Sequence, residues 1–141
     1  MREILFRAKR LDNAEWVYGQ YLQSTDNHGE IIDAFIVLDA YEQIRYGQRH
    51  IYSGLGRESY RVDHQTIGYS TNRTDKNGKS VFTGDILNFD GTVFVCYWDD
   101  GNLEFGLRTK EESIGMAYMA IYDAEIIGNI HDNPELLEVT E

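Results

Sequence analysis

Residues 75–86 read D-K-N-G-K-S-V-F-T-G-D-I, and this stretch decides the fold because it joins a tight turn to the start of a small β-unit. The Asn77–Gly78 pair supplies the positive φ angles that a two-residue hairpin turn requires. The Val-Phe pair that follows suits a pleated, half-buried strand. Gly84 then interrupts the apolar pattern, which predicts a bulge or a barrel corner at that position.

Downstream of the turn, short apolar runs alternate with turn residues and predict five strands. These strands span residues 81–89, 92–98, 102–107, 116–122 and 125–130. Five short strands in succession predict a small barrel. Asn133 and Pro134 then predict a short C-terminal helical turn, with the asparagine as N-cap and the proline at the first helical position.

Upstream of the turn the chain is mostly extended. Three stretches predict strands, namely residues 4–9, 16–22 and 31–38. The first two form a hairpin around residues 11–14. Between residues 39 and 61 the pattern is mixed: Ala40, Tyr41 and Ile44 could line one face of a helix, and the glycines at 47, 54 and 56 favour a loop beyond it. We therefore expect a mainly β protein with a boundary near Val62, dividing an N-terminal β-rich region (1–61) from a barrel domain (62–141).

Composition limits the class of protein. The chain has 141 residues, of which 42% are hydrophobic and 26% charged, as expected for a globular protein with one core or two small ones. No apolar run approaches the roughly 20 residues of a membrane-spanning helix, and the first ten residues lack a secretory apolar region. We expect a cytoplasmic protein without membrane association. Cys96, the single cysteine, is expected to be a small buried hydrophobe.

The net charge of −11 is unevenly distributed along the chain. Residues 1–60 contain seven basic and nine acidic side chains, residues 61–98 four of each, and residues 99–141 two and eleven. The last segment therefore carries −9, which argues against nucleic-acid binding because affinity for phosphates depends on Lys and Arg. This segment is either a solvated acidic face or a docking surface for a basic partner.

Four separated blocks of the sequence resemble the YopX family of phage and prophage proteins from Gram-positive bacteria. They are M-R-E-I-L-F-R-A (1–8), E-W-V-Y-G (15–19), D-K-N-G-K with G-D-I (75–79 and 84–86), and I-I-G-N-I-H-D-N-P-E-L-L (126–137). The chain departs from the family pattern at Lys9, where a tryptophan is usual, and at Asn72, which replaces a glycine. Asparagine tolerates a left-handed backbone, so we expect this turn to be retained.

The resemblance implies a protein of the bacterial cytoplasm, with a C-terminal domain similar to an SH3-type barrel and a tendency to self-associate. The family has no established biochemical activity. It therefore supplies no catalytic, cofactor-binding or metal-binding residues, and none is assigned. We expect a homo-oligomer, with a host or phage protein as a further partner.

The residues themselves provide no motif for a metal or phosphate site. The four histidines (His28, His50, His64 and His131) are scattered, without the spacing of a zinc site. Residues 54–59 contain two glycines but not the third of a dinucleotide-binding loop. Gly78-Lys79-Ser80 lacks the upstream glycine of a P-loop, since Arg73 occupies that position, so we expect turn chemistry there.

Three carboxylates near predicted strand ends, Asp85, Asp99 and Asp100, provide the only enzyme hypothesis. Two carboxyl groups placed across a sugar ring could carry out the acid and base steps of glycoside hydrolysis. The structural alternative is that all three cap turns, as aspartates next to glycines commonly do. We favour this alternative.

Aromatic residues are abundant, with ten tyrosines among them. Those on predicted strands are Tyr18, Tyr21, Tyr97, Tyr118, Tyr122, Trp16 and Trp98. Most such residues fill cores, but we expect some of them to face a partner. Three functions from different classes follow: a non-enzymatic protein-binding or assembly module, which we favour, an acidic effector that binds a basic host protein through residues 99–141, and a carboxylate-dependent hydrolase.

Overall fold

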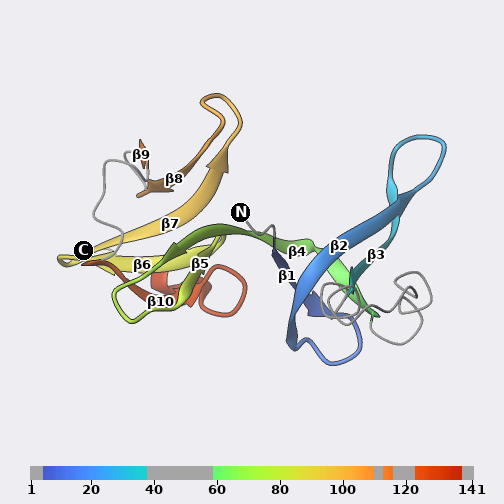
Figure 1. Cartoon of the computed structure of the whole chain (residues 1–141), viewed down its shortest axis with the longest axis horizontal. Helices are drawn as coiled ribbons and strands as arrows, with labels where there is room; N and C mark the ends of the chain where they lie inside the picture. Colours follow the sequence, from blue (N-terminus) through green and yellow to red (C-terminus); the bar gives the residue numbers. More distant parts are fainter. Residues whose placement is uncertain (1–4, 38–58, 110–112, 116–122, 138–141) are drawn as a thin grey trace, which may run out of the picture. The chain divides into compact units, whose positions relative to one another are not determined.

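The structure is a computed structural model that describes residues 5–37, 59–109, 113–115 and 123–137 (Figure 1). Its described part is mainly β, which confirms the expected fold class. The chain divides into two compact units, which we call unit 1, ending at Tyr69, and unit 2, starting at Ser70. The boundary expected near Val62 lies within the same long strand.

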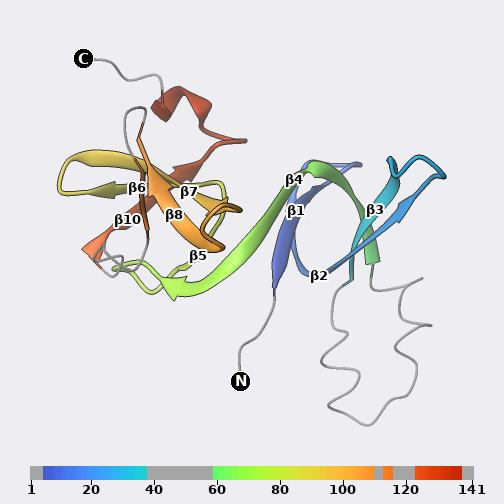
Figure 2. The ribbon, with the colours of Figure 1, turned by 90° about the horizontal axis from the view of Figure 1, so that it is seen from above.

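Unit 1 is built from four antiparallel strands that form a closed circuit. They are β1 (Phe6–Arg10), β2 (Trp16–Thr25), β3 (Ile31–Val37) and the first part of β4 (Ser59–Thr74). β1 pairs with β2 on one side and with β4 on the other, while β3 pairs with both β2 and β4 (Figure 2). The predicted hairpin of β1 and β2 and the strand at β3 are confirmed. The circuit itself was not predicted.

The core of unit 1 is small. Its buried members are Ala8, Ala34, Ile36 and Val62, with Phe6, Val17, Tyr21 and Ile67 packed against them. The ring of Phe6 contacts Tyr21 and meets Tyr69 edge-on, with centroids 5.9 and 5.6 Å apart. Alternation along β1 places Phe6 and Ala8 on this inner face, since successive strand residues point to opposite faces.

β4 is the longest strand of the described residues, and no part of it was predicted as a strand. Beyond Tyr69 it continues into unit 2 and pairs with β5 (Ser80–Phe82) through Ser70 and Thr74. The register shifts between these two pairs, and Asn72 has a φ of 63° there. The left-handed turn expected at Asn72 is therefore confirmed.

Unit 2 contains a five-stranded antiparallel sheet, of which four strands overlap predicted ones and the fifth, at residues 113–115, was not predicted. In spatial order its strands are β10 (Glu125–Asn129), β6 (Asp85–Phe89), β7 (Thr92–Asp99), β8 (Glu104–Arg108) and β9 (Ser113–Gly115). Cross-strand neighbours such as Cys96 and Leu107 share a face of the sheet. The expected strand at 116–122 lies outside the described residues.

One face of this sheet carries the core of unit 2. Its buried members are Val81, Leu87, Phe94, Cys96, Leu107 and Ala124. Cys96 is 1% exposed, which confirms it as a small core residue. Gly84, at a φ of 93°, splits the predicted 81–89 strand into β5 and β6. Its N–H donates to the Cys96 carbonyl and its carbonyl accepts from the Ile130 N–H, so this corner is bonded to β7 and to the residue after β10.

The turn at residues 75–79 differs from the two-residue turn expected for Asn77 and Gly78. Only Gly78 has a positive φ, of 82°. The Gly78 N–H donates to the Asp75 carbonyl at 3.0 Å and the Asp75 N–H to the Lys79 carbonyl at 2.9 Å, which is a type I turn followed by a left-handed glycine. The prediction for Asn77 was wrong because one Asp75 carboxylate oxygen accepts both the Asn77 and Lys79 N–H groups.

Asp75 also connects this turn to β10. Its second carboxylate oxygen accepts the Ile126 N–H at 3.0 Å, and the Lys76 N–H donates to the Ala124 carbonyl at 2.9 Å. The turn thereby covers the open edge of β10 and uses hydrogen-bonding groups that an edge strand would otherwise expose. Burial alone would raise the pKa of Asp75, but the three backbone N–H donors and nearby Lys79 outweigh it, so the pKa lies below its ordinary value.

The last described element is a short 3-10 helix, η4 (Pro134–Leu137), which confirms the predicted C-terminal helical turn. Pro134 is at its first position, as predicted. Asn133 does not direct its side-chain oxygen into this helix, since the oxygen accepts the Asn129 N–H at 3.2 Å. The N-cap role is instead limited to the Asn133 carbonyl, which accepts the Leu136 N–H.

Candidate functional site

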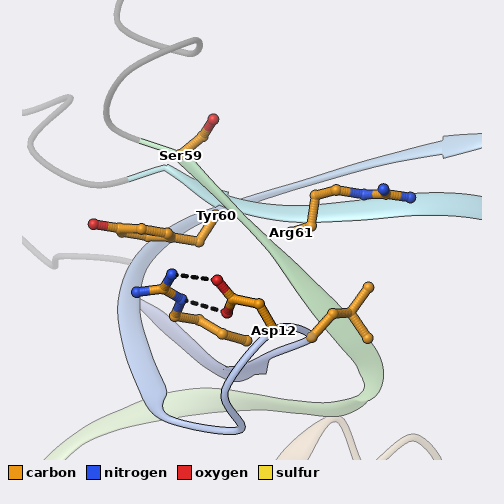
Figure 3. Close-up of a pocket in the computed structure, with 6 residues that line it drawn as sticks. Asp12, Ser59, Tyr60 and Arg61 are labelled. Atoms are coloured by element: carbon orange, nitrogen blue, oxygen red, sulfur yellow. Dashed lines mark hydrogen bonds and ion pairs between the residues drawn. The ribbon is translucent and has the colours of Figure 1, made fainter.

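A pocket of about 330 Å³ opens at one end of unit 1 (Figure 3). Its described lining residues are Arg10, Leu11, Asp12, Ser59, Tyr60 and Arg61. They come from the end of β1, the β1–β2 turn and the start of β4. A pocket of this size lies at the lower end of the range for ligand sites, about 300–1,000 Å³.

Arg10 and Asp12 form the polar wall of the pocket. Arg10 follows Phe6 and Ala8 on the inner face of β1, and its guanidinium lies 4.1 Å from the centroid of the Tyr60 ring. Its Nε and Nη2 donate to the two carboxylate oxygens of Asp12 at 2.9 and 2.6 Å. This hydrogen-bonded pair raises the pKa of Arg10 and lowers the pKa of Asp12. Both groups are therefore charged and compensate each other.

The other charged lining residue is directed elsewhere. Arg61 points away from Asp12 (Figure 3). It forms an ion pair with Asp33 on β3, and its side chain remains 64% exposed. Leu11, 59% exposed, adds an apolar edge. Among the described lining residues there is no histidine that could activate Ser59 as a nucleophile. The pocket can hold a small group against an aromatic ring, and it is not arranged for acid–base chemistry.

The three carboxylates of the enzyme hypothesis have separate structural tasks. Asp85 is 2% exposed and accepts the Phe82 N–H at 2.7 Å, across the Gly84 corner. Asp99 accepts the N–H groups of Gly101 and Asn102 in the β7–β8 turn. Asp100 accepts the indole N–H of Trp98 at 2.7 Å. The turn-capping interpretation therefore accounts for Asp85 and Asp99, whereas Asp100 bonds a side chain, that of Trp98.

Asp99 is also unsuited to act as a general acid. Hydrogen bonds from the side chain and the backbone N–H of Asn102 lower its pKa, with a smaller effect from Gly101. A catalytic acid at neutral pH needs the opposite shift, a raised pKa, which burial among apolar groups provides. The described carboxylates therefore do not form a pair of the kind that glycosidases use.

Histidines and phosphate-binding loops do not form a site in the described part of the chain. His28 and His64 are exposed, His131 is half-buried, and His50 lies outside the described residues. No group of three metal-ligating side chains comes together among the described residues. Lys79 is an exposed turn residue, as expected, and residues 54–58 are not described.

Large apolar side chains are exposed on both units. They are Leu11, Tyr18, Leu22, Ile32, Tyr69, Trp98, Leu103 and Ile127, with exposures from 37 to 75%. Tyr18 and Trp98 were among the aromatic candidates for a partner surface. Leu22, Ile32 and Leu103 were not, because isolated aliphatic residues next to turns carry no recognisable signal in a sequence.

Several of these side chains lie on two hairpins that project from their own units (Figure 1). Leu22 and Ile32 belong to the β2–β3 hairpin, and Trp98 and Leu103 to the β7–β8 hairpin. Leu103 is 75% exposed and has a φ of 54°, a conformation that costs a leucine about 1–2 kcal/mol. Strained backbone of this kind is most often found at functional positions.

In the described part of the chain, no helix is long and apolar enough to cross a membrane.

Comparison with known proteins identifies relatives by fold and family. The chain is similar to the crystal structure of protein EF1440 from Enterococcus faecalis, with a TM-score of 0.56 and 23% identity over 96% of this chain and 98% of that one. At this identity the likeness shows the fold. No curated protein matches the chain. Neither the neighbour nor the family is described by an enzymatic activity. The model of the YopX protein family matches residues 5–138, and the chain therefore belongs to the YopX family.

Proposed function

We propose that this protein is a non-enzymatic protein-binding and assembly module. The observation that carries the proposal is the exposure of Leu22, Ile32, Trp98 and Leu103 on two projecting hairpins. Exposed apolar and aromatic side chains on projecting hairpins are available for contact with another protein, and aromatic residues are enriched at such interfaces. The Trp98 ring is held in place by Asp100 and by Phe105, whose ring centroid lies 5.0 Å away, so its exposed edge is preorganised.

The absence of a reaction centre among the described residues agrees with this function. The pocket of unit 1 has compensated charges, Asp85 and Asp99 each accept backbone N–H groups at a turn, and Asp100 accepts the indole N–H of Trp98. We therefore favour binding over a carboxylate-dependent hydrolase. We place the protein in the cytoplasm of a bacterium that carries a phage or prophage, which fits its single, buried cysteine.

Light scattering coupled to size-exclusion chromatography tests the assembly function. The full chain has a mass of 16.3 kDa, and we expect the measured mass to rise above this value as the protein concentration increases. Because apolar surface drives the association, added salt should weaken it little. A mass of one chain at every concentration would remove the assembly function.

A second candidate rests on the charge of the C-terminal segment. The described residues of 99–141 include seven acidic side chains and Arg108 as the basic one. An acidic surface of this kind suits a basic host protein. Binding to a polycation such as polylysine, measured by titration calorimetry, should then weaken steeply between 50 and 300 mM salt, a range that spans the usual screening lengths of roughly 6–14 Å.

A further inference from the structure

Asn77 and Gly78 in the turn at residues 75–79 form a chemically reactive pair. In an Asn-Gly pair the backbone nitrogen of the glycine attacks the side-chain carbonyl carbon of the asparagine, and glycine presents no Cβ that would obstruct the approach. The sequence has eight asparagines, and Asn77 is the one that a glycine follows. The turn therefore places the most reactive asparagine of the chain at its centre.

The surroundings of this pair leave room for the reaction. Asn77 and Gly78 are both exposed, and within the described residues the side-chain amide of Asn77 makes no hydrogen bond. The amide of Asn102, by comparison, donates to Asp99 at 2.9 Å. No heavy atom beyond the adjoining residues lies within 4 Å of a Cβ built on Gly78. No neighbouring segment of the described chain therefore blocks ring closure.

The hydrogen bonds of the turn oppose the reaction. The Gly78 N–H donates to the Asp75 carbonyl at 3.0 Å, and the Asn77 N–H donates to an Asp75 carboxylate oxygen at 2.9 Å. The attacking atom is the glycine nitrogen after it has lost its proton, and in the closed turn the Asp75 carbonyl holds that proton. The ring can therefore close only while the turn is open, and Asp75 determines how often this occurs.

We propose that Asn77 is a site of spontaneous modification, controlled by Asp75, and that the modification releases the turn from β10. In the open turn the deprotonated Gly78 nitrogen bonds to Cγ of Asn77, and the side-chain nitrogen leaves as ammonia with the proton that Gly78 has lost. The product is a five-membered succinimide. Water then breaks the bond from the Gly78 nitrogen to Cγ, which gives aspartate, or the bond to the backbone carbonyl carbon, which gives isoaspartate.

Both products disturb the hydrogen bonds of Asp75. Each adds a carboxylate to a chain that already carries −11, directly beside the Asp75 carboxylate, and like charges in contact repel one another. Isoaspartate also lengthens the backbone by one atom, because its Cβ becomes part of the main chain. The single Asp75 oxygen that accepts the residue 77 and Lys79 N–H groups then no longer fits both. Its second oxygen loses its position against the Ile126 N–H.

Peptide mapping by mass spectrometry measures the reaction in the full, folded chain during incubation at neutral pH. We expect residue 77 to become aspartate and isoaspartate. Asp75→Ala removes the acceptor that keeps the turn closed, and it should accelerate the conversion at least about ten-fold. Gly78→Ala should slow it at least about ten-fold, because its Cβ obstructs the attacking nitrogen.

The exposed turn at residues 26–30 provides the controls. Asn27 lies in this turn, but His28 follows it, so it should keep its amide in the same samples. The matched variant is Asp26→Ala, which removes the carboxylate that accepts the His28 and Glu30 N–H groups. It should leave the rate at Asn77 unchanged.

Two results would overturn the site. Asn77 could keep its amide in the folded protein over the period in which the chain unfolded in guanidinium is converted, which would show that the folded turn does not react. Equal rates in Asp75→Ala and in the unmodified protein would show that Asp75 does not control the reaction. If circular dichroism shows Asp75→Ala to be unfolded, Asp75→Asn, which keeps one acceptor oxygen, replaces it, and an unchanged rate there has the same meaning.

Hydrogen exchange tests the release from β10. Ion-exchange chromatography separates the converted chains by their additional negative charge. In these chains the Ile126 amide should lose protection, while the amides between β7 and β8 keep theirs. Equal protection of the Ile126 amide in converted and unconverted chains would overturn the release.

Discussion

The same five-residue turn occurs in both units, and the two copies differ in what surrounds them. In residues 26–30 the Asp26 N–H donates to the Glu30 carbonyl and the Gly29 N–H to the Asp26 carbonyl. One Asp26 carboxylate oxygen accepts the N–H groups of His28 and Glu30. Residues 75–79 repeat this pattern with Asp75 and Gly78, and both glycines have a φ of 82°.

The difference lies in burial and in one additional hydrogen bond. The turn at 26–30 is exposed at the tip of the β2–β3 hairpin. Asp75 is 3% exposed, and its second oxygen holds the Ile126 N–H of β10. Identical turn chemistry therefore serves a hairpin tip in unit 1 and a connection between distant segments in unit 2. The comparison shows that the importance of a motif depends on its contacts.

Replacing the aspartate of each turn by alanine should give the largest difference in stability loss between the two turns. We expect Asp75→Ala to lower the free energy of unfolding of unit 2 by about 2–4 kcal/mol, because buried N–H groups lose their acceptor. Asp26→Ala should cost about 0.5–1 kcal/mol, since water replaces the carboxylate at an exposed turn. Urea unfolding measures both variants, with Trp98 fluorescence reporting on unit 2 and Trp16 on unit 1. Equal losses would show that burial does not distinguish the turns.

Substituting the glycine of each turn should destabilise the two turns equally. Neither Gly29 nor Gly78 has a heavy atom within 4 Å of an added Cβ, so the penalty comes from the left-handed backbone alone. We expect Gly29→Ala and Gly78→Ala to cost about 1–2 kcal/mol each, and the same within error. Thermal unfolding of the pair checks this. A much larger loss in Gly78→Ala would mean that the turn anchored by the buried Asp75 cannot relax.

Acid should weaken unit 2 through Asp75. The folded pKa of Asp75 lies below its unfolded value, so its ionised carboxylate stabilises the fold above the unfolded pKa, about 3.9. That contribution is lost as the pH falls through the folded pKa. Asp75→Asn should therefore show a flatter dependence of unit 2 stability on pH below about 4. If the stability of unit 2 depends on pH in the same way in the unmodified protein and in Asp75→Asn, Asp75 is not the cause of the loss in acid.

The smallest effect on stability is expected for an exposed ion pair between the same turn and β10. Lys76 lies 3.7 Å from a carboxylate oxygen of Glu125, and both side chains are about half exposed. Lys76→Met should change the stability of unit 2 by less than about 0.5 kcal/mol, because exposed ion pairs contribute little. A loss comparable to that of Asp75→Ala would show that the ion pair, and not the Ile126 hydrogen bond, holds the turn at residues 75–79 against β10.

Sequence patterns predicted much of unit 2 and less of unit 1. Alternation of apolar residues and the glycines at turns located most strands of the five-stranded sheet, and the left-handed residue at Asn72 followed from its chemistry. The strand between Ser59 and Thr74 was missed, because its apolar residues are few and polar residues separate them. The pocket beside Tyr60 was missed with it, since three of its described lining residues lie at the start of that strand.

The sequence by itself determined the local features of this protein: its turns, its β character and its family. These depend on backbone preferences and side-chain chemistry within a few residues. Only the tertiary structure decided that β1 closes a circuit with β4 and that Asp75 reaches Ile126 while Asp26 stays in water. Such features join residues far apart in the chain, and the free energy of those contacts depends on burial that no local pattern encodes.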